Sequence, residues 1–358
     1  MDAVKKVAAA GIFHFGLWRP YFHLRRPRQN STAAILTFHR LVDDRDEYLL
    51  KGPTVQSHAR IFEQVVAVLA RYYSIISLND IVAHLKSDEP FARDSVAIVF
   101  DDGYEDNFRL GLPVLTRYGV PATVFIAAGF IDRKDLMWTD RVEQGLLQTR
   151  RQGIDLGCLG LELPYQYLPL QTRGHRIRAN IIMSQILKDL NVSDLAGTLR
   201  KFEAMLGTDP SNYPRRMMTW GEVRALADSG IDIGSHGVSH AILTKLGFQE
   251  ACGEIRVSKA IIEDKIQRPV RHFAYPNGRE EDFSDALRDA CVASGYDSVS
   301  SCVWGVNRPH RDTPFFLKRI GLIGGSAPTL LLSLERLFRA EAVETGESLS
   351  RSHATDLV

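Results

Sequence analysis

Short, continuous runs of apolar and β-branched residues alternate along this chain with segments of helical periodicity, and this alternation limits the folds open to it. Runs that are apolar at every position are typical of parallel strands that are buried on both faces. Repeated strand–helix alternation predicts an α/β fold with a parallel sheet, either a closed barrel or a doubly wound open sheet. The candidate strands are Ala33–Phe38, Val96–Phe100, Ala122–Ile126, Ile231–Gly234, His272–Tyr275, Ser298–Ser301 and Leu317–Ile320.

Helical segments lie between these strands, and some of them open with capping sequences. Gln56–Tyr72 carries apolar residues at helical spacing. Thr219 is followed three residues later by Glu222, the pattern of a capping box, and Gly230 is placed to end that helix. Further helices are expected from Ser77 towards Leu85, from Ser284 to Gly295, and over Asp140–Arg151, Arg178–Leu206 and Thr329–Ala340.

The stretch from about residue 133 to residue 215 interrupts the alternation and is mostly helical, which predicts an insertion. We therefore expect a basic N-terminal arm over residues 1–30 and one domain over residues 31–325 that carries the insertion. Residues 326–358 are expected to form a C-terminal helix and a disordered tail, because the last part is polar and lacks aromatic residues.

The N-terminal arm leaves two interpretations open. Its apolar run, Val7–Trp18, is too short to span a bilayer, and no signal-peptide cleavage pattern follows it. The run fits an amphipathic helix that packs on the domain or lies at a surface. With the basic cluster of Arg25, Arg26 and Arg28, it also fits a peripheral membrane contact. We expect a cytoplasmic location, with membrane association if the arm binds lipid.

The charge balance argues against nucleic acid as a partner. The chain has 44 Lys and Arg residues and 43 Asp and Glu residues, so its formal charge is +1, and a nucleic-acid-binding surface would need a basic excess. The four cysteines form no CxxC pair. This argues against a disulfide scaffold or a cysteine–zinc site and favours a reducing compartment.

Two adjacent carboxylates, Asp101 and Asp102, follow the predicted strand Val96–Phe100, and Gly103 comes next. In parallel α/β folds, functional groups gather at the C-terminal ends of strands. One carboxylate can bind a cation while its neighbour stays ionised beside that cation as a base. The alternative is a plain turn, because Asp-Asp-Gly is also ordinary turn chemistry.

Two histidines, His236 and His240, follow another predicted strand, Ile231–Gly234. A spacing of four residues places both imidazoles on one side of a helical turn, where they can share one zinc ion. Two histidines and one carboxylate make the three protein ligands typical of a catalytic zinc site. The alternative is that the spacing arises by chance and each ring only caps a strand.

A third strand runs into a tight turn at Phe273–Gly278, where Pro276 and Gly278 fix the loop. Such a loop either directs a backbone N–H into a cleft or is an ordinary β-turn. The three strand ends together favour a site over three separate coincidences.

These motifs resemble those of the polysaccharide deacetylase family, the carbohydrate esterases of family 4 that share the NodB homology domain. Phe100-Asp101-Asp102-Gly103-Tyr104 is similar to its TFDDGY-type motif, and His236-Gly237-Val238-Ser239-His240 to its H-[S/T]-x-x-H motif. Phe273–Gly278 resembles its third loop, Pro121–Phe125 resembles the strand after its first helix, and the likeness covers roughly Ala33 to Ile320. The resemblance implies a deformed (β/α) barrel, a divalent metal, usually zinc, and an acetylated glycan as substrate.

The resemblance also implies roles for the matching residues. Asp101 would be the general base, and Asp102, His236 and His240 would bind the metal. In the third loop, which includes Pro276, the backbone N–H of Asn277 would help to hold the oxyanion.

Aromatic residues offer candidate sugar contacts. Tyr104, Trp138 and Trp220 could each stack on a sugar ring or belong to the core. We take Tyr104 and Pro276, beside Asn277, as candidate substrate-binding residues.

The chain departs from the family pattern at three places. Gly237 follows His236 where Ser or Thr is common. Ala274 stands where many members have an arginine that pairs with the base, and Arg319, at the end of a late strand, is the candidate substitute. No late strand ends in the histidine that usually acts as the general acid in this family. His39 instead follows the first strand, an arrangement that resembles permuted exopolysaccharide deacetylases, and it is our candidate general acid. The alternative for His39 is a histidine packed at a strand end.

The function expected from this resemblance is metal-dependent hydrolysis of the N-acetyl group of an N-acetylhexosamine-containing polysaccharide, oligosaccharide or lipid-linked glycan. Two alternatives stay open at this point. One is a catalytically inactive glycan-binding protein of the same fold, and the other is a metal hydrolase that acts on another amide or on an O-acetyl ester.

Overall fold

The computed structural model describes residues 31–43, 56–164, 166–214, 216–321 and 327–340. Seven parallel strands close a barrel. They follow one another from β1 round to β5, and β1 and β5 also pair with each other. The α/β prediction is confirmed, and of its two forms the chain adopts the barrel. Around the barrel the order is β1 (Ala33–Phe38), β12 (Leu317–Gly321), β11 (Ser298–Trp304), β10 (His272–Ala274), β9 (Asp232–Ser235), β6 (Thr123–Ile126) and β5 (Ser95–Phe100).

The first strand along the chain closes the barrel. All six residues of β1 pair with β5, from Ala33 opposite Ser95 to Phe38 opposite Phe100, and its other edge pairs with β12. The end of β1 therefore lies beside the end of β5. A short strand, β4 (Ser74–Ile75), pairs with the first two residues of β5 and does not enter the ring.

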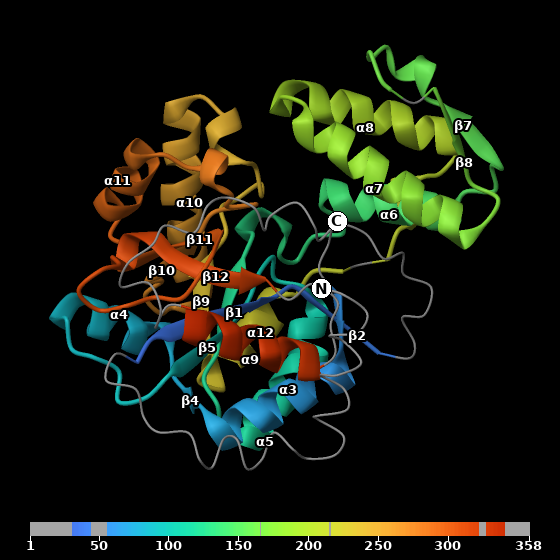
Figure 1. Cartoon of the computed structure of the whole chain (residues 1–358). Helices are drawn as coiled ribbons and strands as arrows, with labels where there is room; N and C mark the ends of the chain where they lie inside the picture. Colours follow the sequence, from blue (N-terminus) through green and yellow to red (C-terminus); the bar gives the residue numbers. More distant parts are fainter. Residues whose placement is uncertain (1–30, 44–55, 165, 215, 322–326, 341–358) are drawn as a thin grey trace.

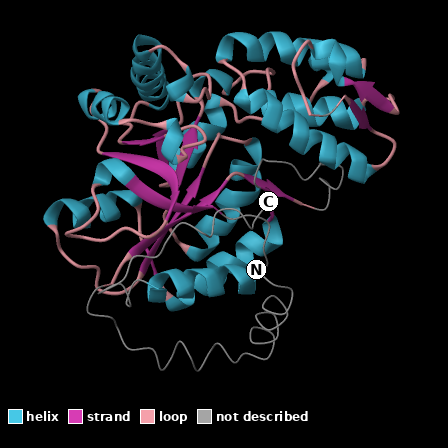
Figure 2. Ribbon diagram, turned by 45° about the horizontal axis from the view of Figure 1, so that its top comes forward, coloured by secondary structure: helices cyan, strands magenta, loops and turns pink. Residues whose placement is uncertain are grey.

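Side chains alternate between the barrel interior and the surrounding helices, as the pleat of a strand requires. In β1, Ala33 and Ile35 belong to an inner cluster, and Leu36 and Phe38 belong to the outer core. Figure 2 shows the strands gathered at the centre with helices outside them. The outer helices include α3 (Ala59–Tyr72), α5 (Leu112–Tyr118), α9 (Trp220–Asp228), α10 (Phe248–Ile266), α11 (Asp285–Ala293) and α12 (Ala327–Ala340).

Helix α4 (Leu78–Ser87) contributes Leu78, Ile81 and Leu85 to the inner cluster. This helix therefore packs against the interior of the barrel. The capping box expected at Thr219 is formed, and the helix expected from Ser77 also opens with one, each with its side chain accepting from the third helical N–H.

Some elements differ from the sequence prediction. The helix expected to begin at Gln56 begins at Ala59, because Gln56–His58 forms a strand, β3, that pairs with β2 (Arg40–Val42). The helix expected over Arg178–Leu206 is two helices, α7 (Arg173–Asp189) and α8 (Val192–Leu206), because Leu190 and Asn191 between them are extended. Helices α5 and α10 were not predicted.

A helical subdomain lies beside the barrel in Figure 1, built from α6 (Trp138–Gln148), α7 and α8 with a small hairpin of β7 (Gly153–Asp155) and β8 (Tyr167–Pro169). It has its own apolar core, in which Leu146, Met183 and Phe202 are fully buried. The boundaries expected for the domain and its insertion stay predictions.

The predicted N-terminal arm and the predicted disordered tail after residue 340 lie outside the described residues. Within the described part of the chain, none of the helices combines the length and the apolar character needed to cross a bilayer.

Candidate active site

The ends of β5 and β9 bring the carboxylates and the histidines together. Asp102 has φ +79° and Gly103 has φ +92°, so the chain turns sharply as it leaves β5. A side chain at Gly103 would be strained at this φ and would also meet Ile126 at about 3.0 Å. This turn explains why a glycine follows the two carboxylates.

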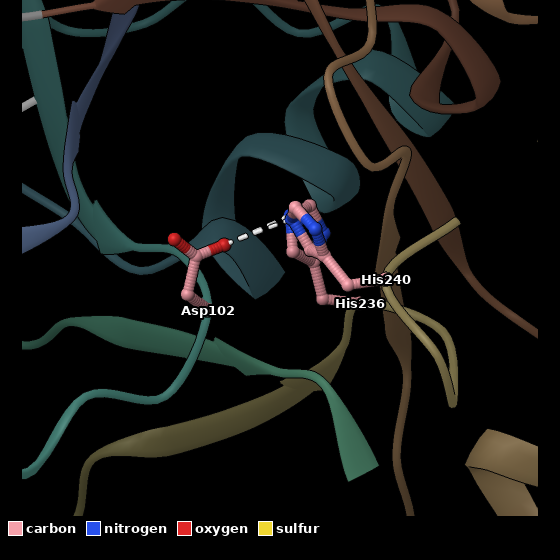
Figure 3. Close-up of side chains that lie close together, drawn as sticks. All are labelled: Asp102, His236 and His240. Carbon is pink, nitrogen blue, oxygen red and sulfur yellow. Dashed lines mark ion pairs between the residues drawn. The ribbon is translucent and has the colours of Figure 1, made fainter. Parts of the chain in front are cut away.

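Asp102, His236 and His240 converge on one point (Figure 3). The Nε2 atoms of His240 and His236 lie 3.1 and 3.5 Å from Asp102 Oδ1. His236 Nδ1 lies 2.7 Å from the Ala274 carbonyl oxygen, which can only accept, so Nδ1 carries the proton and the lone pair of Nε2 points into the cluster. Asp102 Oδ1 is buried and receives no hydrogen bond of good geometry from the part of the chain that the structure describes.

The convergence of buried atoms that carry lone pairs is the donor set expected of a divalent metal site with two histidines and one carboxylate. The residues therefore fit the metal that the motifs predicted. Zinc suits this set of nitrogen and oxygen ligands, and the arrangement does not identify the ion.

Burial and the neighbouring opposite charges shift the pKa values of these three groups in opposite directions. Burial lowers the pKa of His236 to about 4, which keeps that ring neutral. Burial alone would raise the pKa of Asp102, but the His240 imidazole beside it holds that pKa well below its ordinary value. Burial likewise opposes the positive form of His240, and the Asp102 carboxylate outweighs it and raises the pKa of that ring. The carboxylate is therefore ionised and available as a ligand.

Asp101 is held by a buried arginine from β12, which is separated from β5 by β1 alone. Arg319 on β12 is 1% exposed, and its Nη1 lies 2.8 and 2.9 Å from the two carboxylate oxygens of Asp101. Its Nε donates to the Ser301 carbonyl at 2.6 Å. Burial would raise the pKa of the Asp101 carboxyl, but Arg319 and the nearby imidazoles keep that pKa below its ordinary value.

His39 follows β1 and faces the same carboxylate. Its Nε2 lies 3.9 Å from Asp101 Oδ2, and its side chain is 23% exposed. Asp101 and His39 are adjacent because β1 and β5 are paired neighbours, with the Asp101 N–H donating to the Phe38 carbonyl at 2.9 Å. The structure thus brings a carboxylate and an imidazole together beside Asp102, His236 and His240, which we call the ligand cluster.

The third loop is rigid. Asn277 and Gly278 have φ values of +64° and +62°, and a side chain on Gly278 would meet the Cys302 nitrogen at 3.0 Å. The Asn277 side-chain amide donates to Asp282, whereas its backbone N–H has no acceptor among the described residues. Pro276 is buried. The loop therefore leaves one backbone donor available, and whether that donor meets an oxyanion stays a prediction.

Tyr104 does not have the position expected of a sugar contact. It is 0% exposed, its hydroxyl donates to Asp140 Oδ2 at 3.1 Å, and the Arg40 guanidinium lies 5.1 Å from the centre of its ring. Both faces and the hydroxyl are thus enclosed by protein, and Tyr104 links the loop after β5 to helix α6. Trp220 is a core residue, and Trp138 packs against the core of the helical subdomain.

An aromatic residue that the motifs did not indicate is exposed near the site. Trp304 ends β11, is 50% exposed and pairs in register with Arg319. It lies outside every motif, so only the strand register and the exposure indicate it.

Supporting residues were also missed. Glu254 on α10 accepts from the backbone N–H groups of Val238 and Ser239 at 2.7 and 2.9 Å, and so holds the loop between the two histidines. Asp106 and Asn107 bind the segment that starts at His39. No sequence spacing links these residues to the loops that they hold.

Comparisons with known proteins identify the family and the fold of this chain. The polysaccharide deacetylase family matches residues 88–299, more than half of the chain. Over 72 residues the chain is 31% identical to YxkH of Bacillus subtilis (strain 168), described as "Putative polysaccharide deacetylase". That match covers 20% of this chain and 26% of YxkH, so the chain spans about a quarter of that relative.

Solved structures share the fold. The deacetylase PplD of Streptococcus pyogenes, in complex with acetate, has a TM-score of 0.55 and 16% identity, covering 85% of this chain and 98% of PplD. IcaB from Ammonifex degensii has a TM-score of 0.53 and 16% identity, covering 85% of this chain and 97% of IcaB. At such identities the likeness establishes a common barrel and no more.

Proposed function

This chain belongs to the polysaccharide deacetylase family, and from that premise we propose that it is a metal-dependent hydrolase that removes the N-acetyl group from an N-acetylhexosamine in a polysaccharide, oligosaccharide or lipid-linked glycan. The observation that carries this proposal is the convergence of Asp102, His236 and His240 beside the Asp101–Arg319 pair. A protein that only binds glycans has no need of a buried, ionised carboxylate held next to a metal donor set.

Asp102, His236 and His240 would hold the metal. When bound, a divalent metal at such a site polarises a carbonyl and lowers the pKa of a coordinated water. The donor set suits a divalent cation, and zinc is the ion that we propose.

The protein's own groups supply the proton transfers. Asp101, kept ionised by Arg319, takes the proton of the attacking water while the water oxygen bonds to the acetyl carbon. The Asn277 N–H donates to the oxygen of the resulting tetrahedral intermediate. His39, as the cation, gives its proton to the amide nitrogen as the carbon–nitrogen bond breaks. The products are acetate and the free sugar amine.

Trp304 is the residue that we propose for stacking on a sugar ring. Half of its surface is exposed, and it is the register partner of the arginine that holds the base. A flat apolar face of this kind packs well against the apolar face of a pyranose ring.

The proposal is tested by acetate release from N-acetylglucosamine oligomers, with the purified protein loaded with zinc or cobalt, after chelation, and with Asp101→Asn. Metal-dependent release that is lost in the variant would support it. Release from O-acetylated xylan alone would move the activity to an ester hydrolase. A protein that binds no metal at all would contradict the proposal.

A further inference from the structure

The segment that carries His39 is held by two buried residues from the turn after β5. Asn107 Nδ2 donates to the His39 carbonyl oxygen at 2.7 Å. Asp106 Oδ1 accepts from the Leu41 N–H at 2.9 Å, and Asp106 Oδ2 accepts from Arg40 Nε at 3.0 Å. His39, Arg40 and Leu41 are thus each bound in turn, by residues that lie within six positions of Asp101.

Asn107 and Asp106 are also bound to each other. Asn107 Nδ2 donates to Asp106 Oδ1 at 3.1 Å, so one amide group bridges a carboxylate and the His39 carbonyl. The two residues are 1% and 3% exposed. Both partners of Nδ2 can only accept hydrogen bonds, which fixes the orientation of the amide. A buried, oriented contact of this kind limits the movement of the backbone that it holds.

The local backbone is unusual at the same place. Residues Asn107–Gly111 form a single turn of π-helix before α5, closed by a bond from the Leu112 N–H to the Asn107 carbonyl. Such turns are rare and are found mainly at functional sites. At the end of this turn, a side chain on Gly111 would lie 3.4 Å from Leu41 and 3.5 Å from Phe100. The wide turn therefore packs directly on the segments that carry His39 and Asp101.

We propose that Asn107, supported by Asp106, is a positioning residue that fixes the His39 imidazole for proton donation to the leaving amine. The inference rests on the proposed function. The side-chain amide of Asn107 is bonded to the His39 carbonyl and to Asp106, and not to Asp102, His236 or His240. It acts through the backbone of His39, whose own ring makes one polar contact with the described residues, the 3.9 Å approach to Asp101.

The leaving group decides whether this positioning matters. An amide nitrogen leaves poorly unless it is protonated, whereas the oxygen of an aryl ester leaves as a stable anion without a proton. Hydrolysis of an aryl acetate still needs Asp101 and the ligand cluster. The ratio of amide to aryl ester hydrolysis therefore isolates the proton donor, and it does not depend on how much of the protein is folded.

The experiment compares kcat/KM on N-acetylglucosamine oligomers and on 4-nitrophenyl acetate for the zinc-loaded full chain and for Asn107→Ala. Because a displacement of about 1 Å can cost about 10²-fold, we expect the amide rate to fall by up to that factor and the ester rate to stay unchanged within error. Asn107→Asp keeps the size of the side chain and removes the amide donor. It should show the same loss of ratio if the alanine variant folds poorly.

His39→Gln alone should lower the ratio, and adding Asn107→Ala to it should lower the ratio no further, because both changes act on one group. The matched control is Asn307→Ala. Asn307 is a buried asparagine that donates to the carbonyl groups of Lys318 and Ala33 at the far end of β1. That variant should lose stability and keep the ratio.

Equal losses on both substrates would show that Asn107 only maintains the fold, and additive losses with His39→Gln would show that it does not act through His39. Either result would overturn the inference and leave the deacetylase activity standing. A wild-type protein that hydrolyses the aryl ester but releases no acetate from any N-acetylated sugar would instead remove the proposed function, and this inference with it.

Discussion

Asp101 and Asp102 are neighbours in the chain, yet their surroundings differ. Asp101 is bound by a guanidinium on β12, whereas Asp102 has both imidazole Nε2 atoms within 3.5 Å of one oxygen. The positive φ of Asp102 separates the two side chains. At the scale of single residues, a turn has therefore given two identical carboxylates different partners.

This difference predicts different outcomes for two substitutions. Asp102→Ala should lose the bound metal and the activity together, because it removes one of three ligands. Asp101→Asn should keep the metal and lose about 10²–10⁴ in kcat, the usual worth of a general base. Metal content by mass spectrometry and acetate release would be measured on the same samples. An Asp101→Asn protein as active as the wild type would exclude Asp101 as the base.

Arg319 should set the pH at which Asp101 becomes protonated. Burial raises the pKa of Asp101, and Arg319 together with the nearby imidazoles more than offsets that effect. Arg319→Ala removes the largest of these offsetting charges while the burial remains, so the pKa of Asp101 should rise, and the activity should be lost at a higher pH as the pH falls. Opposite charges shift a carboxyl pKa by about 1–3 units, so the acid limb of kcat/KM should move upward by about that amount.

The same variant should be less stable, because removal of one member of a buried ion pair costs about 3–5 kcal/mol. Arg268→Ala is the control, since Arg268 makes an exposed pair with Asp228. If the acid limb of Arg319→Ala coincided with that of the wild type, Arg319 would have no role in keeping the base ionised.

At the scale of elements, helix α10 supports the histidine loop through one carboxylate. Glu254 accepts two consecutive backbone N–H groups between His236 and His240. Groups that orient metal ligands from behind are commonly worth 10–100-fold in metal affinity. Glu254→Ala should therefore weaken zinc binding by about 10–100-fold, measured by competition with a chelator of known affinity.

Glu263→Ala is the matched control for this prediction. Glu263 lies on the same helix and also accepts a backbone N–H, that of Val270 at 2.9 Å, away from the histidine loop. Its loss should lower the melting temperature without a change in zinc affinity. Similar affinities in both variants would mean that the loop does not need Glu254 to present its histidines.

The elements that could be predicted are those whose own sequence carries the signal. Several strands of the barrel, such as β1 and β5, are buried at every position and read as largely apolar runs, and all seven strands were found within a few residues. Helix α10 was not found because its buried positions include Ala251 and Ser258, which leave a thin apolar stripe. The strands β2 and β3 have three residues each, too few to show a period.

The site residues likewise divide into those that their own sequence indicates and those that it does not. Asp101, Asp102, His236 and His240 stand directly at strand ends, where topology alone brings them together. The roles of Asn107 and Glu254 depend on contacts across the fold, over 68 and 16 residues of sequence, and neither position shows a pattern. Tyr104 was misplaced because the sequence does not show which aromatic ring the helical subdomain covers.

At the scale of the whole molecule, the helical subdomain is attached to the active site itself. Its returning segment pairs with the loop after β5, with Glu105 N–H donating to the Arg216 carbonyl at 2.8 Å and Met218 N–H to the Gly103 carbonyl at 3.1 Å. Asp140 on α6 accepts from Tyr104 in the same loop. The subdomain therefore supports the turn that carries Asp101 and Asp102.

The far end of the helical subdomain contacts the segment that follows β9 and the histidine loop. Lys245, five residues after His240, donates to the carbonyl groups of Lys188 and Leu190 at the turn between α7 and α8. Burial and the charge of Arg279 lower the pKa of Lys188, whereas Asp282 and Cys302 act to raise it. The tip of the subdomain is thus bonded to the segment that follows the histidine loop, and we expect a glycan that enters the site to meet the tip there.

We therefore expect Lys245→Met to loosen the tip and to weaken the binding of long substrates. Each hydrogen bond is worth about 0.5–1.5 kcal/mol, so KM for N-acetylglucosamine oligomers should rise about 2–10-fold. kcat/KM for 4-nitrophenyl acetate should not change, because that substrate is too small to reach the tip. Lys259→Met is the control, since Lys259 binds the Val270 and Gly295 carbonyl groups in the same way on the outside of the barrel. Hydrogen exchange over residues 186–192 would report the loosening directly. Faster exchange with an unchanged KM would show that the subdomain supports the site from one side only and does not contact the glycan.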